Sequence, residues 1–317
     1  MSTSATSTAV PSARKYTLLG DYAMLVKPRV STMVVITSAA GFYLGSLRSG
    51  ISPFHLGMVH AILGIALVTC GSAALNQAIE RKSDRLMPRT ARRPMAQGRI
   101  GLAHGLLVGF ALVFGGSLYL AFATNLITGT LTLLTAILYV AVYTPLKRFT
   151  TLNTFIGAFP GALPPLLGWT AARGLIEWPG VALFAILFVW QFPHFMAIGW
   201  MYRADYAKGG IHVTAAQQPV SWAARSSVLQ SLFYAVVMIP VSLWPTWLHV
   251  TGKPYAVVAV ILGIWYLVAT IRFARITRNP EDPANRAIAR DLLKVSVIYL
   301  PLLMVALMIN AQGKIHF

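Results

Sequence analysis

The chain has 317 residues, of which 56% are apolar and only 11% are charged. Soluble globular domains are about 25% charged, so this composition, with a mean hydropathy of +0.66, excludes an ordinary soluble protein. Its 26 Lys and Arg residues against 8 Asp and Glu residues give a formal net charge of +18. Nucleic-acid binders are also basic, but they need basic residues over a wet face, and long stretches here carry no charge. The sequence predicts a polytopic membrane protein with no nucleic-acid partner.

Nine segments have the length and apolar character of a membrane span, which needs about 20 residues. They are 30–48, 55–78, 101–122, 125–144, 152–172, 178–200, 226–249, 255–274 and 292–311. The third and fourth almost adjoin, which indicates a tight hairpin. We expect an all-α fold of nine transmembrane helices in one domain, residues 21–317. A Ser/Thr/Ala-rich tail, residues 1–20, is expected to be disordered.

The basic residues are distributed unevenly over the loops. If successive loops alternate between the two sides of the membrane, 22 of the 26 Lys and Arg residues fall on one side. Such a bias identifies the cytoplasmic side. It predicts a cytoplasmic N-terminus and, with nine spans, an external C-terminus.

Three oxygen-bearing side chains recur every fourth residue where the second span reaches the cytoplasmic side, namely Asn76, Glu80 and Asp84. At about 100° and 1.5 Å per residue, this spacing places them along one helix face. Carboxylate and amide oxygens suit Mg²⁺, which also takes water and substrate phosphates as ligands. Basic residues that follow would complement those phosphates; they include Arg85, Arg89 and Arg93. On spacing alone, a solvated helix end with local ion pairs explains the two carboxylates equally well.

Three further places near the cytoplasmic side carry candidate residues. Asp205 lies at the exit of the sixth span and could join the first acidic group around one metal–diphosphate cluster. Lys147 and Arg148, at the exit of the fourth span, could close over the same anion or serve only as membrane anchors. His194 is an intramembrane ionisable residue, which makes it a functional candidate, although a structural, hydrogen-bonded histidine fits the sequence as well.

The fifth predicted span is rich in residues that break helices. It contains Gly157, Pro160, Gly161, Pro164, Pro165 and Gly168. This composition predicts a kinked helix whose freed backbone groups face a protein cavity rather than lipid.

These motifs resemble those of the UbiA-type intramembrane prenyltransferases, in the pattern Asn76-x-x-x-Glu80-x-x-x-Asp84 and the step Tyr143-x-x-x-Lys147. Longer strings resemble the branch of that family that farnesylates protohaem IX. These strings are LNQAIERKSDRLMPRTARRPMAQGRI (75–100), YTPLKRFTTLNTFIGAFPGALPPLLGW (143–169) and WQFPHFMAIGWMYRADYAKGGI (190–211).

The resemblance implies nine spans around a central cavity and the transfer of a farnesyl group from farnesyl diphosphate to a vinyl group of haem B, giving haem O. It implies that Mg²⁺ and diphosphate are held by Asn76, Glu80, Asp84 and Asp205. The phosphates would be contacted by Arg85, Arg89, Arg93, Tyr143, Lys147 and Arg148, and haem by His194. It further implies a place in a bacterial inner membrane, with haem A synthase or oxidase assembly proteins as candidate partners.

The chain departs from the family pattern in two places. Glu80 stands where many family members have Asp. After Gly209-Gly210 the chain reads IHVTAAQQP (211–219) in place of a Pro-Met-Leu-Pro-like run, in a loop that we expect to cover the active site.

Two other functions are compatible with parts of the sequence. One is a related prenyltransferase acting on an aromatic or chlorin acceptor, against which the longer strings argue. The other is a secondary transporter, which the broken fifth span favours. Transporters place their polar sites near the bilayer midplane, however, whereas the acidic residues here lie at span exits.

Overall fold

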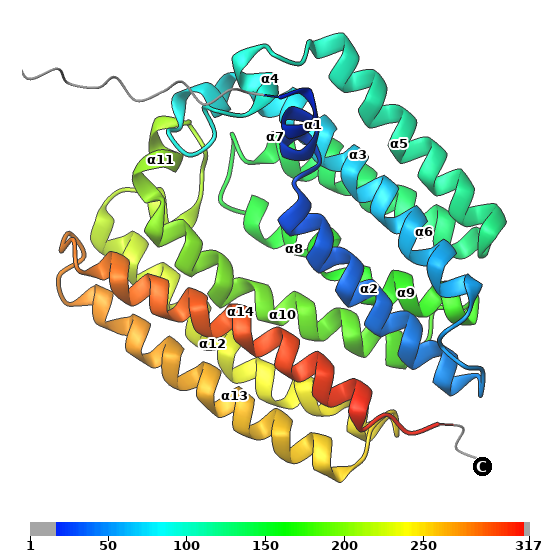
Figure 1. Ribbon diagram of the computed structural model, residues 1–317. Coiled ribbons are helices and arrows are strands. Elements are labelled where there is room, and N and C mark those ends of the chain that lie inside the picture. The colour runs from blue at the N-terminus through cyan, green and yellow to red at the C-terminus, as the bar shows by residue number, and fades with distance from the viewer. Residues whose placement is uncertain (1–16, 314–317) are drawn as a thin grey trace, which may run out of the picture.

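Helices make up most of the computed structural model, which describes residues 17–313 (Figure 1). Within those residues no strand occurs, and the single β-bridge joins Thr251 to Ala311. The elements are α1 (Leu18–Val26), α2 (Pro28–Arg48), α3 (Leu56–Leu86), α4 (Pro94–Gln97), α5 (Leu102–Ala123), α6 (Leu126–Ile137), η1 (Leu138–Tyr143), α7 (Thr144–Leu146), α8 (Asn153–Ala162), α9 (Pro164–Arg173), α10 (Trp178–Met201), α11 (Arg203–Lys208), η2 (Thr214–Ala216), α12 (Val220–Trp247), α13 (Lys253–Phe273), η3 (Ala274–Thr277) and α14 (Asn285–Ile309). The predicted all-α fold is confirmed.

The predicted disordered tail, residues 1–20, falls mostly outside the described residues. Its last residues are ordered, because Leu18–Gly20 form the first turn of α1. That turn is capped by Thr17, whose Oγ1 accepts a hydrogen bond from the Gly20 amide at 3.1 Å. Helix α1 therefore begins before the predicted domain boundary.

Eight helical segments within residues 17–313 are long and apolar enough to cross a membrane, so the chain is a multi-pass membrane protein. They are Val30–Arg48, Leu56–Leu86, Leu102–Ala123, Leu126–Leu146, Trp178–Met201, Val220–Trp247, Lys253–Thr277 and Asn285–Ile309. The predicted hairpin between the third and fourth spans is confirmed. Helix α5 ends at Ala123, and Asn125 caps α6 by accepting a hydrogen bond from the Thr128 amide at 2.9 Å.

The remaining predicted span, 152–172, is not a continuous helix. It consists of α8 and α9, ten residues each, with Leu163 between them. Pro160 lies inside α8, and Pro164 begins α9. Proline lacks a backbone N–H and its ring clashes with the preceding turn, so the helix breaks here. The predicted kink is confirmed, and it replaces one long span by two short helices.

Helices α2 and α9 pack with their backbones in contact. A Cβ on Gly41 would lie 1.9 Å from the Pro165 carbonyl oxygen, and one on Gly168 would lie 1.8 Å from the Ser38 carbonyl oxygen. Only glycine permits this approach on each helix. The crossing fixes the broken α8–α9 segment against α2.

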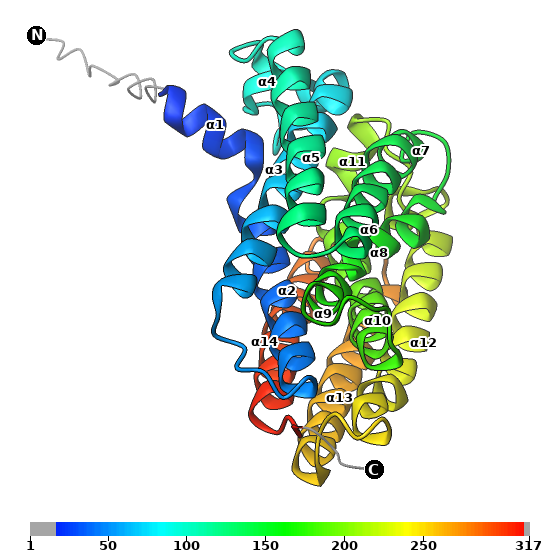
Figure 2. The same cartoon turned by 90° about the vertical axis from the view of Figure 1, so that its right-hand side faces the viewer.

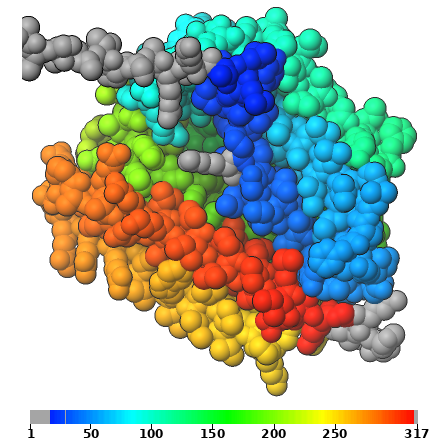
Figure 3. Space-filling model, viewed as in Figure 1, coloured from blue at the N-terminus to red at the C-terminus, as the bar shows by residue number. Residues whose placement is uncertain are grey.

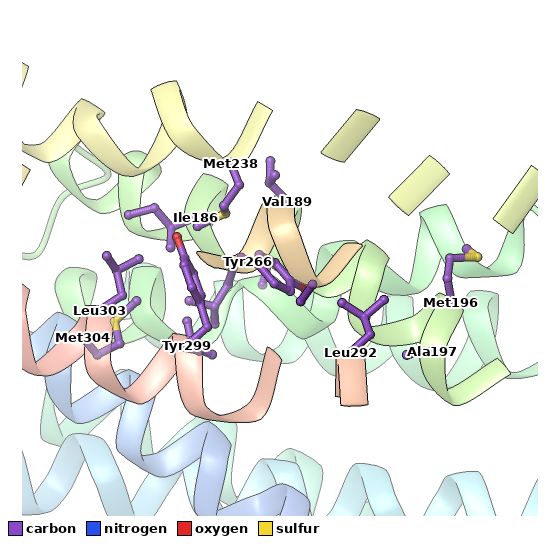
Figure 4. Close-up of a cluster of buried hydrophobic side chains, with 14 of the residues drawn as sticks. Ile186, Val189, Met196, Ala197, Met238, Tyr266, Leu292, Tyr299, Leu303 and Met304 are labelled. Atoms are coloured by element: carbon purple, nitrogen blue, oxygen red, sulfur yellow. The ribbon is translucent and has the colours of Figure 1, made fainter. Parts of the chain in front are cut away.

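The C-terminal helices enclose the largest hydrophobic cluster, which lies between α10, α12, α13 and α14 (Figure 4). At its centre the rings of Tyr266 and Tyr299 stack with centroids 4.9 Å apart. The Tyr266 hydroxyl donates to the Trp190 carbonyl oxygen at 3.0 Å, and Trp190 Nε1 donates to the Ser296 carbonyl oxygen at 2.8 Å. These bonds tie α10 to α13 and α14.

The short helices gather at one end of the bundle, which we call the polar end and define as α1, α4, α7 and α11 with the adjoining end of α3 (Figures 1 and 2). Helix α3 has 31 residues and is about 46 Å long, so it extends beyond the roughly 30 Å of a bilayer core. Helices α2 and α14 diverge toward this end, and Figure 3 shows the surface hollowed between them.

We expect Gly168→Ala to destabilise the protein, because the added methyl group must push α9 away from the Ser38 carbonyl oxygen. Overpacking of this kind costs about 1–3 kcal/mol. The matched control is Gly115→Ala on α5, where nothing lies within 4 Å of the new Cβ; it should be neutral or slightly stabilising, since Ala favours helix. Thermal unfolding in detergent measures both. Equal melting temperatures for the two variants would contradict the close crossing.

Candidate functional site

A cavity of about 190 Å³ opens at the polar end. It is bounded by α3 and the loop after it, by the residues around α7, and by the segment that follows α11. The lining residues are Lys27, Asn76, Glu80, Asp84, Met87, Arg89, Thr90, Arg93, Tyr143, Lys147, Asn153, Tyr206, Ile211 and Val213.

Two carboxylates are buried in this cavity, each beside a cation. Asp84, 1% exposed, accepts hydrogen bonds from Arg93 Nη1 on both oxygens, at 2.9 and 2.8 Å. Glu80, 6% exposed, accepts one from Lys147 Nζ at 2.7 Å, and Arg93 Nη1 lies 3.8 Å from its other oxygen. Buried carboxylates need such partners. The predicted stack therefore faces one cavity, and its carboxylates are not a solvated helix end.

The amide of Asn76, at 0% exposure, is oriented by bonds on both sides. Its Nδ2 donates to Thr144 Oγ1 at 3.1 Å, and Thr144 Oγ1 donates to the Tyr139 carbonyl oxygen at 2.8 Å. Its Oδ1 accepts from Lys27 Nζ at 2.6 Å. Because Nδ2 is held by Thr144, the oxygen of Asn76 is the atom presented beside the two carboxylates.

The segment that supplies Tyr139 and Tyr143 is a π-helix, η1. Short π-helical turns occur frequently at functional sites. Here the turn leads directly into α7, so Tyr143 and Lys147 both reach the cavity. The Lys147 ammonium lies 4.3 Å from the centroid of the Tyr143 ring, a cation–π distance.

Positive charge exceeds negative charge in the lining, which contains four basic and two acidic side chains. Burial, and next the positive charge of Arg93, lower the pKa of Lys27 to about 7. Burial alone would lower the pKa of Lys147 as well, but Tyr143 and Glu80 outweigh it and raise that pKa above its usual range. The surplus of cations suits an anionic ligand with several charges.

Seven of the predicted site residues line the cavity: Asn76, Glu80, Asp84, Arg89, Arg93, Tyr143 and Lys147. Four do not. Arg85 donates through Nε to the Ala96 carbonyl oxygen, and Arg148 donates to that of Ile79 at 3.2 Å. Asp205 lies on α11, next to the lining residue Tyr206, and His194 lies within α10. The roles predicted for these four residues stay predictions.

Four polar lining residues are not among the predicted site residues, namely Lys27, Thr90, Asn153 and Tyr206. Thr90 lies between Arg89 and Arg93 in the sequence, and Tyr206 follows Asp205. Lys27 precedes the first predicted span, and Asn153 is near the start of the broken one. Tyr206 stacks near Arg89, whose guanidinium carbon lies 5.6 Å from its ring centroid. The sequence signal for these lining residues is their position next to predicted site residues or predicted spans.

The atypical loop after Gly210 covers part of the cavity, as expected. Ile211 and Val213 line it. The His212 amide donates to the Lys147 carbonyl oxygen at 2.7 Å, and Asn153 Nδ2 donates to the His212 carbonyl oxygen. The loop is thus fastened to the segment that supplies Lys147.

Two further hollows adjoin the cavity. A small pocket between α8, α10 and η2 shares Tyr143, Asn153, Tyr206 and Val213 with the cavity. That pocket in turn shares Thr154 and Thr214 with a groove of about 520 Å³ lined by Phe155, Phe192, Phe233 and Tyr234, among others. The cavity, the pocket and the groove therefore adjoin one another, and we call the pocket and the groove together the side channel.

The cavity residues fit a magnesium–diphosphate pair. Residues 17–313 contain no cluster of three or more His, Cys, Asp or Glu side chains that could hold a metal alone. Mg²⁺ commonly uses one or two carboxylates and completes its shell with water and substrate phosphates. Glu80, Asp84 and the Asn76 oxygen supply that partial set, and the surrounding cations remain for the phosphates.

Comparison with known proteins identifies the family. The profile described as the UbiA prenyltransferase family matches residues 34–297. A relative from Koribacter versatilis named "Protoheme IX farnesyltransferase" is 43% identical over 302 residues, covering 95% of this chain and 96% of the relative. The chain belongs to the UbiA prenyltransferase family.

Further proteins are similar to this chain in sequence or in fold. A relative of the same name from Solibacter usitatus is 38% identical, covering 92% of this chain and 99% of the relative. A solved digeranylgeranylglyceryl phosphate synthase superposes with a TM-score of 0.73 at 17% identity, covering 92% of this chain and 98% of the other. A UbiA homologue from Archaeoglobus fulgidus, solved with GPP and Mg²⁺, has a TM-score of 0.56 at 18% identity, covering 90% and 99%. The predicted UbiA-like fold is confirmed.

We expect Lys147→Met to lower the stability of the ligand-free protein, because it leaves the buried Glu80 carboxylate without its closest cation. Breaking a buried pair costs about 3–5 kcal/mol, and the double variant Glu80→Gln/Lys147→Met should recover most of the loss. Thermal unfolding of the wild type, the two single variants Glu80→Gln and Lys147→Met, and the double variant completes a double-mutant cycle. The control is Lys294→Met, which removes the exposed ion pair between Lys294 and Asp291, 3.6 Å apart. This variant should change stability by about 0–1 kcal/mol. An equal effect at both lysines would contradict the pairing.

Proposed function

We propose that the protein transfers a farnesyl group from farnesyl diphosphate to a vinyl group of haem B and forms haem O. The cavity carries the proposal, because a buried carboxylate pair and an amide oxygen face a surplus of cations there. Membership of the UbiA prenyltransferase family gives the reaction class. Relatives that align over nearly their whole length and are named protohaem IX farnesyltransferases give the substrates.

The side chains at the cavity have separable tasks in this reaction. Asn76, Glu80 and Asp84 would hold Mg²⁺, which when bound neutralises charge on the leaving diphosphate. Lys27, Arg89, Arg93 and Lys147 would bind the phosphate oxygens and stabilise the same charge. To reach the phosphates, Arg93 and Lys147 must exchange their present carboxylate partners for substrate oxygens. Tyr143, which lies against the Lys147 ammonium, is positioned to steady that residue. Three other predicted residues lie outside the cavity lining. Asp205 would have to move to join the magnesium ligands. Arg85 and Arg148 would have to move to contact the diphosphate.

The reaction breaks the bond between the farnesyl C1 carbon and the diphosphate oxygen, which keeps the electron pair. The vinyl π-electrons form the new C–C bond, and water quenches the cation left on the inner vinyl carbon and releases a proton. An allylic cation must be kept from water until the new bond forms. Ile211 and Val213 of the covering loop would exclude water beside the diphosphate.

The side channel is suited to the farnesyl chain. It begins at Tyr143 and Asn153 in the cavity and ends in an aromatic groove that includes Phe192 and Tyr234. An isoprenoid chain anchored by its diphosphate could lie along it without contact with water.

His194 is the candidate haem contact, and its hydrogen bonds support that role. Its Nδ1 lies 2.8 Å from Ser296 Oγ, and that hydroxyl donates its proton to the Leu293 carbonyl oxygen at 2.6 Å. Ser296 must therefore accept from Nδ1–H, which leaves Nε2 with a free lone pair, the state that ligates iron. Helix α14, which carries Ser296, also borders the hollow in Figure 3.

The relatives are bacterial, and we propose a bacterial inner membrane with the polar end in the cytoplasm. The excess of Lys and Arg in the loops at that end supports this orientation. An association with haem A synthase or oxidase assembly proteins stays a prediction.

We expect Asp84→Asn to reduce farnesyl transfer by on the order of 100-fold or more, since it removes one charge from the metal and diphosphate site. The assay is extraction of haems from cells that lack their own haem O synthase, followed by turnover of the purified protein with farnesyl diphosphate and haem B, with and without Mg²⁺. Asp291→Asn, at an exposed residue, is the control. Undiminished turnover would overturn the metal assignment, and farnesylation of an aromatic acid in place of haem would assign the other prenyltransferase function.

We expect His194→Ala to weaken haem B binding by about tenfold, the usual lower range for loss of a ligand or its support, with a smaller effect for Ser296→Ala. Haem titration followed by absorbance measures both. His60→Ala is the control, since His60 is likewise bonded to a hydroxyl, that of Tyr119 at 2.5 Å. An unchanged haem affinity in His194→Ala would return this histidine to a structural role.

A further inference from the structure

A third buried ion pair lies at the polar end, outside the cavity lining. Asp21 of α1 is 6% exposed. Arg99 Nε donates to its two oxygens at 3.0 and 2.9 Å, and Arg99 Nη2 lies 2.9 Å from Oδ1. Asp21 precedes the first predicted span, a place that is typical of a solvated charge. Its burial against a residue 78 positions away shows that α1 is instead fixed to the segment after α4.

Arg99 extends this link to a cavity cation. Its Nη2 also donates to the Arg92 carbonyl oxygen at 3.0 Å. The next residue is Arg93, whose guanidinium holds both oxygens of Asp84. One side chain thus joins α1 to the backbone that positions Arg93.

The other end of α1 leads to a second cavity cation. Gln77, at 0% exposure, donates to the Met24 and Leu25 carbonyl oxygens at 2.8 and 2.9 Å. Lys27 follows in a left-handed conformation, with φ 49°, and its ammonium reaches Asn76. A non-glycine residue holds this conformation only where its surroundings fix it, and α1 supplies part of those surroundings.

We propose that Asp21 and Arg99 form a positioning pair for diphosphate binding. By clamping α1 onto the segment 92–99, the pair holds Lys27 and Arg93 on the same cavity although they come from different elements. Neither Asp21 nor Arg99 lines the cavity, so their effect passes through the two cations. The inference rests on the proposed function in that it assumes a diphosphate ligand.

The pair should affect substrate binding more than turnover. When α1 is loosened, Lys27 and Arg93 lose their mutual alignment, and substrate binding must restore it. Misplacement of a binding group by about 1 Å can cost as much as 100-fold. With α1 held only by Gln77 and its apolar contacts, a smaller loss of about tenfold in diphosphate affinity is expected.

The experiment uses the full-length protein in detergent. Asp21→Asn, Arg99→Asp and the charge-swapped double variant Asp21→Arg/Arg99→Asp are compared with wild type. The single variants should raise KM for farnesyl diphosphate about tenfold and leave kcat within about threefold. They should weaken binding of inorganic pyrophosphate with Mg²⁺, measured by calorimetry, by the same factor, and the charge swap should restore both quantities toward wild type.

The matched control is Glu177→Gln, at an ion pair of similar geometry. Arg173 Nε and Nη2 donate to the two Glu177 oxygens at 2.8 and 3.0 Å, at the far ends of α9 and α10 from the polar end. This variant should leave KM and pyrophosphate affinity unchanged.

Unchanged pyrophosphate affinity in both single variants, with only a loss of thermal stability like that of Glu177→Gln, would overturn the proposal and make the pair purely structural. The same would follow from a charge swap that restores stability without restoring affinity. Pyrophosphate affinity does not depend on the acceptor, so this measurement tests the positioning pair independently of haem O formation. Absence of haem O formation by the wild type would instead contradict the proposed function.

Discussion

Two carboxylates buried at the end of a transmembrane helix impose a constraint that organises the whole polar end. Glu80 and Asp84 have little exposure, and charge in such a place is tolerated only when it is compensated at close range. The compensating cations cannot all come from α3 itself. Arg93 arrives from the loop that follows α3, Lys147 from the segment after α7, and Lys27 from the junction of α1 and α2. The short helices outside the bundle are the means by which these side chains reach one point.

The same constraint prepares the cavity for its ligand. The cations are already stripped of much of their water and held by neighbours, so an entering diphosphate meets charges that need little reorganisation. Their hydrogen-bond partners, however, are the carboxylates that we assign to Mg²⁺. Metal and diphosphate binding thus require an exchange of partners within the cavity. A ligand that brings both positive and negative charge satisfies every side chain, whereas either charge alone leaves some without a partner.

Much of the fold and of the cavity could be predicted from local sequence patterns. The remaining features depend on contacts between segments that are distant in the sequence. Helical spacing predicts the stack of Asn76, Glu80 and Asp84, and the prolines near Leu163 predict a broken span. No local pattern distinguishes Asp21 from a solvated acid, since its partner Arg99 lies on another element. Lys27 and Asn153 were missed as site residues for the same reason. His194 was predicted as an ionisable residue within a predicted span, but its bond to Ser296 joins helices a hundred residues apart.

The π-helix between Leu138 and Tyr143 has a consequence for how such a sequence can vary. Its wider turns set the rotation of everything that follows, including Thr144, which steadies Asn76, and Lys147, which pairs with Glu80. Deleting one residue from this apolar stretch would keep its hydropathy and its capacity to span a bilayer. A π-helical turn closes its hydrogen bond over five residues where an α-helical turn uses four, so the shortened stretch would close as an ordinary α-helix. The wide turn that carries Tyr139 and Tyr143 would then be lost. The segment can therefore exchange one apolar residue for another during evolution, while its length is fixed by the extra residue that the wide turn holds.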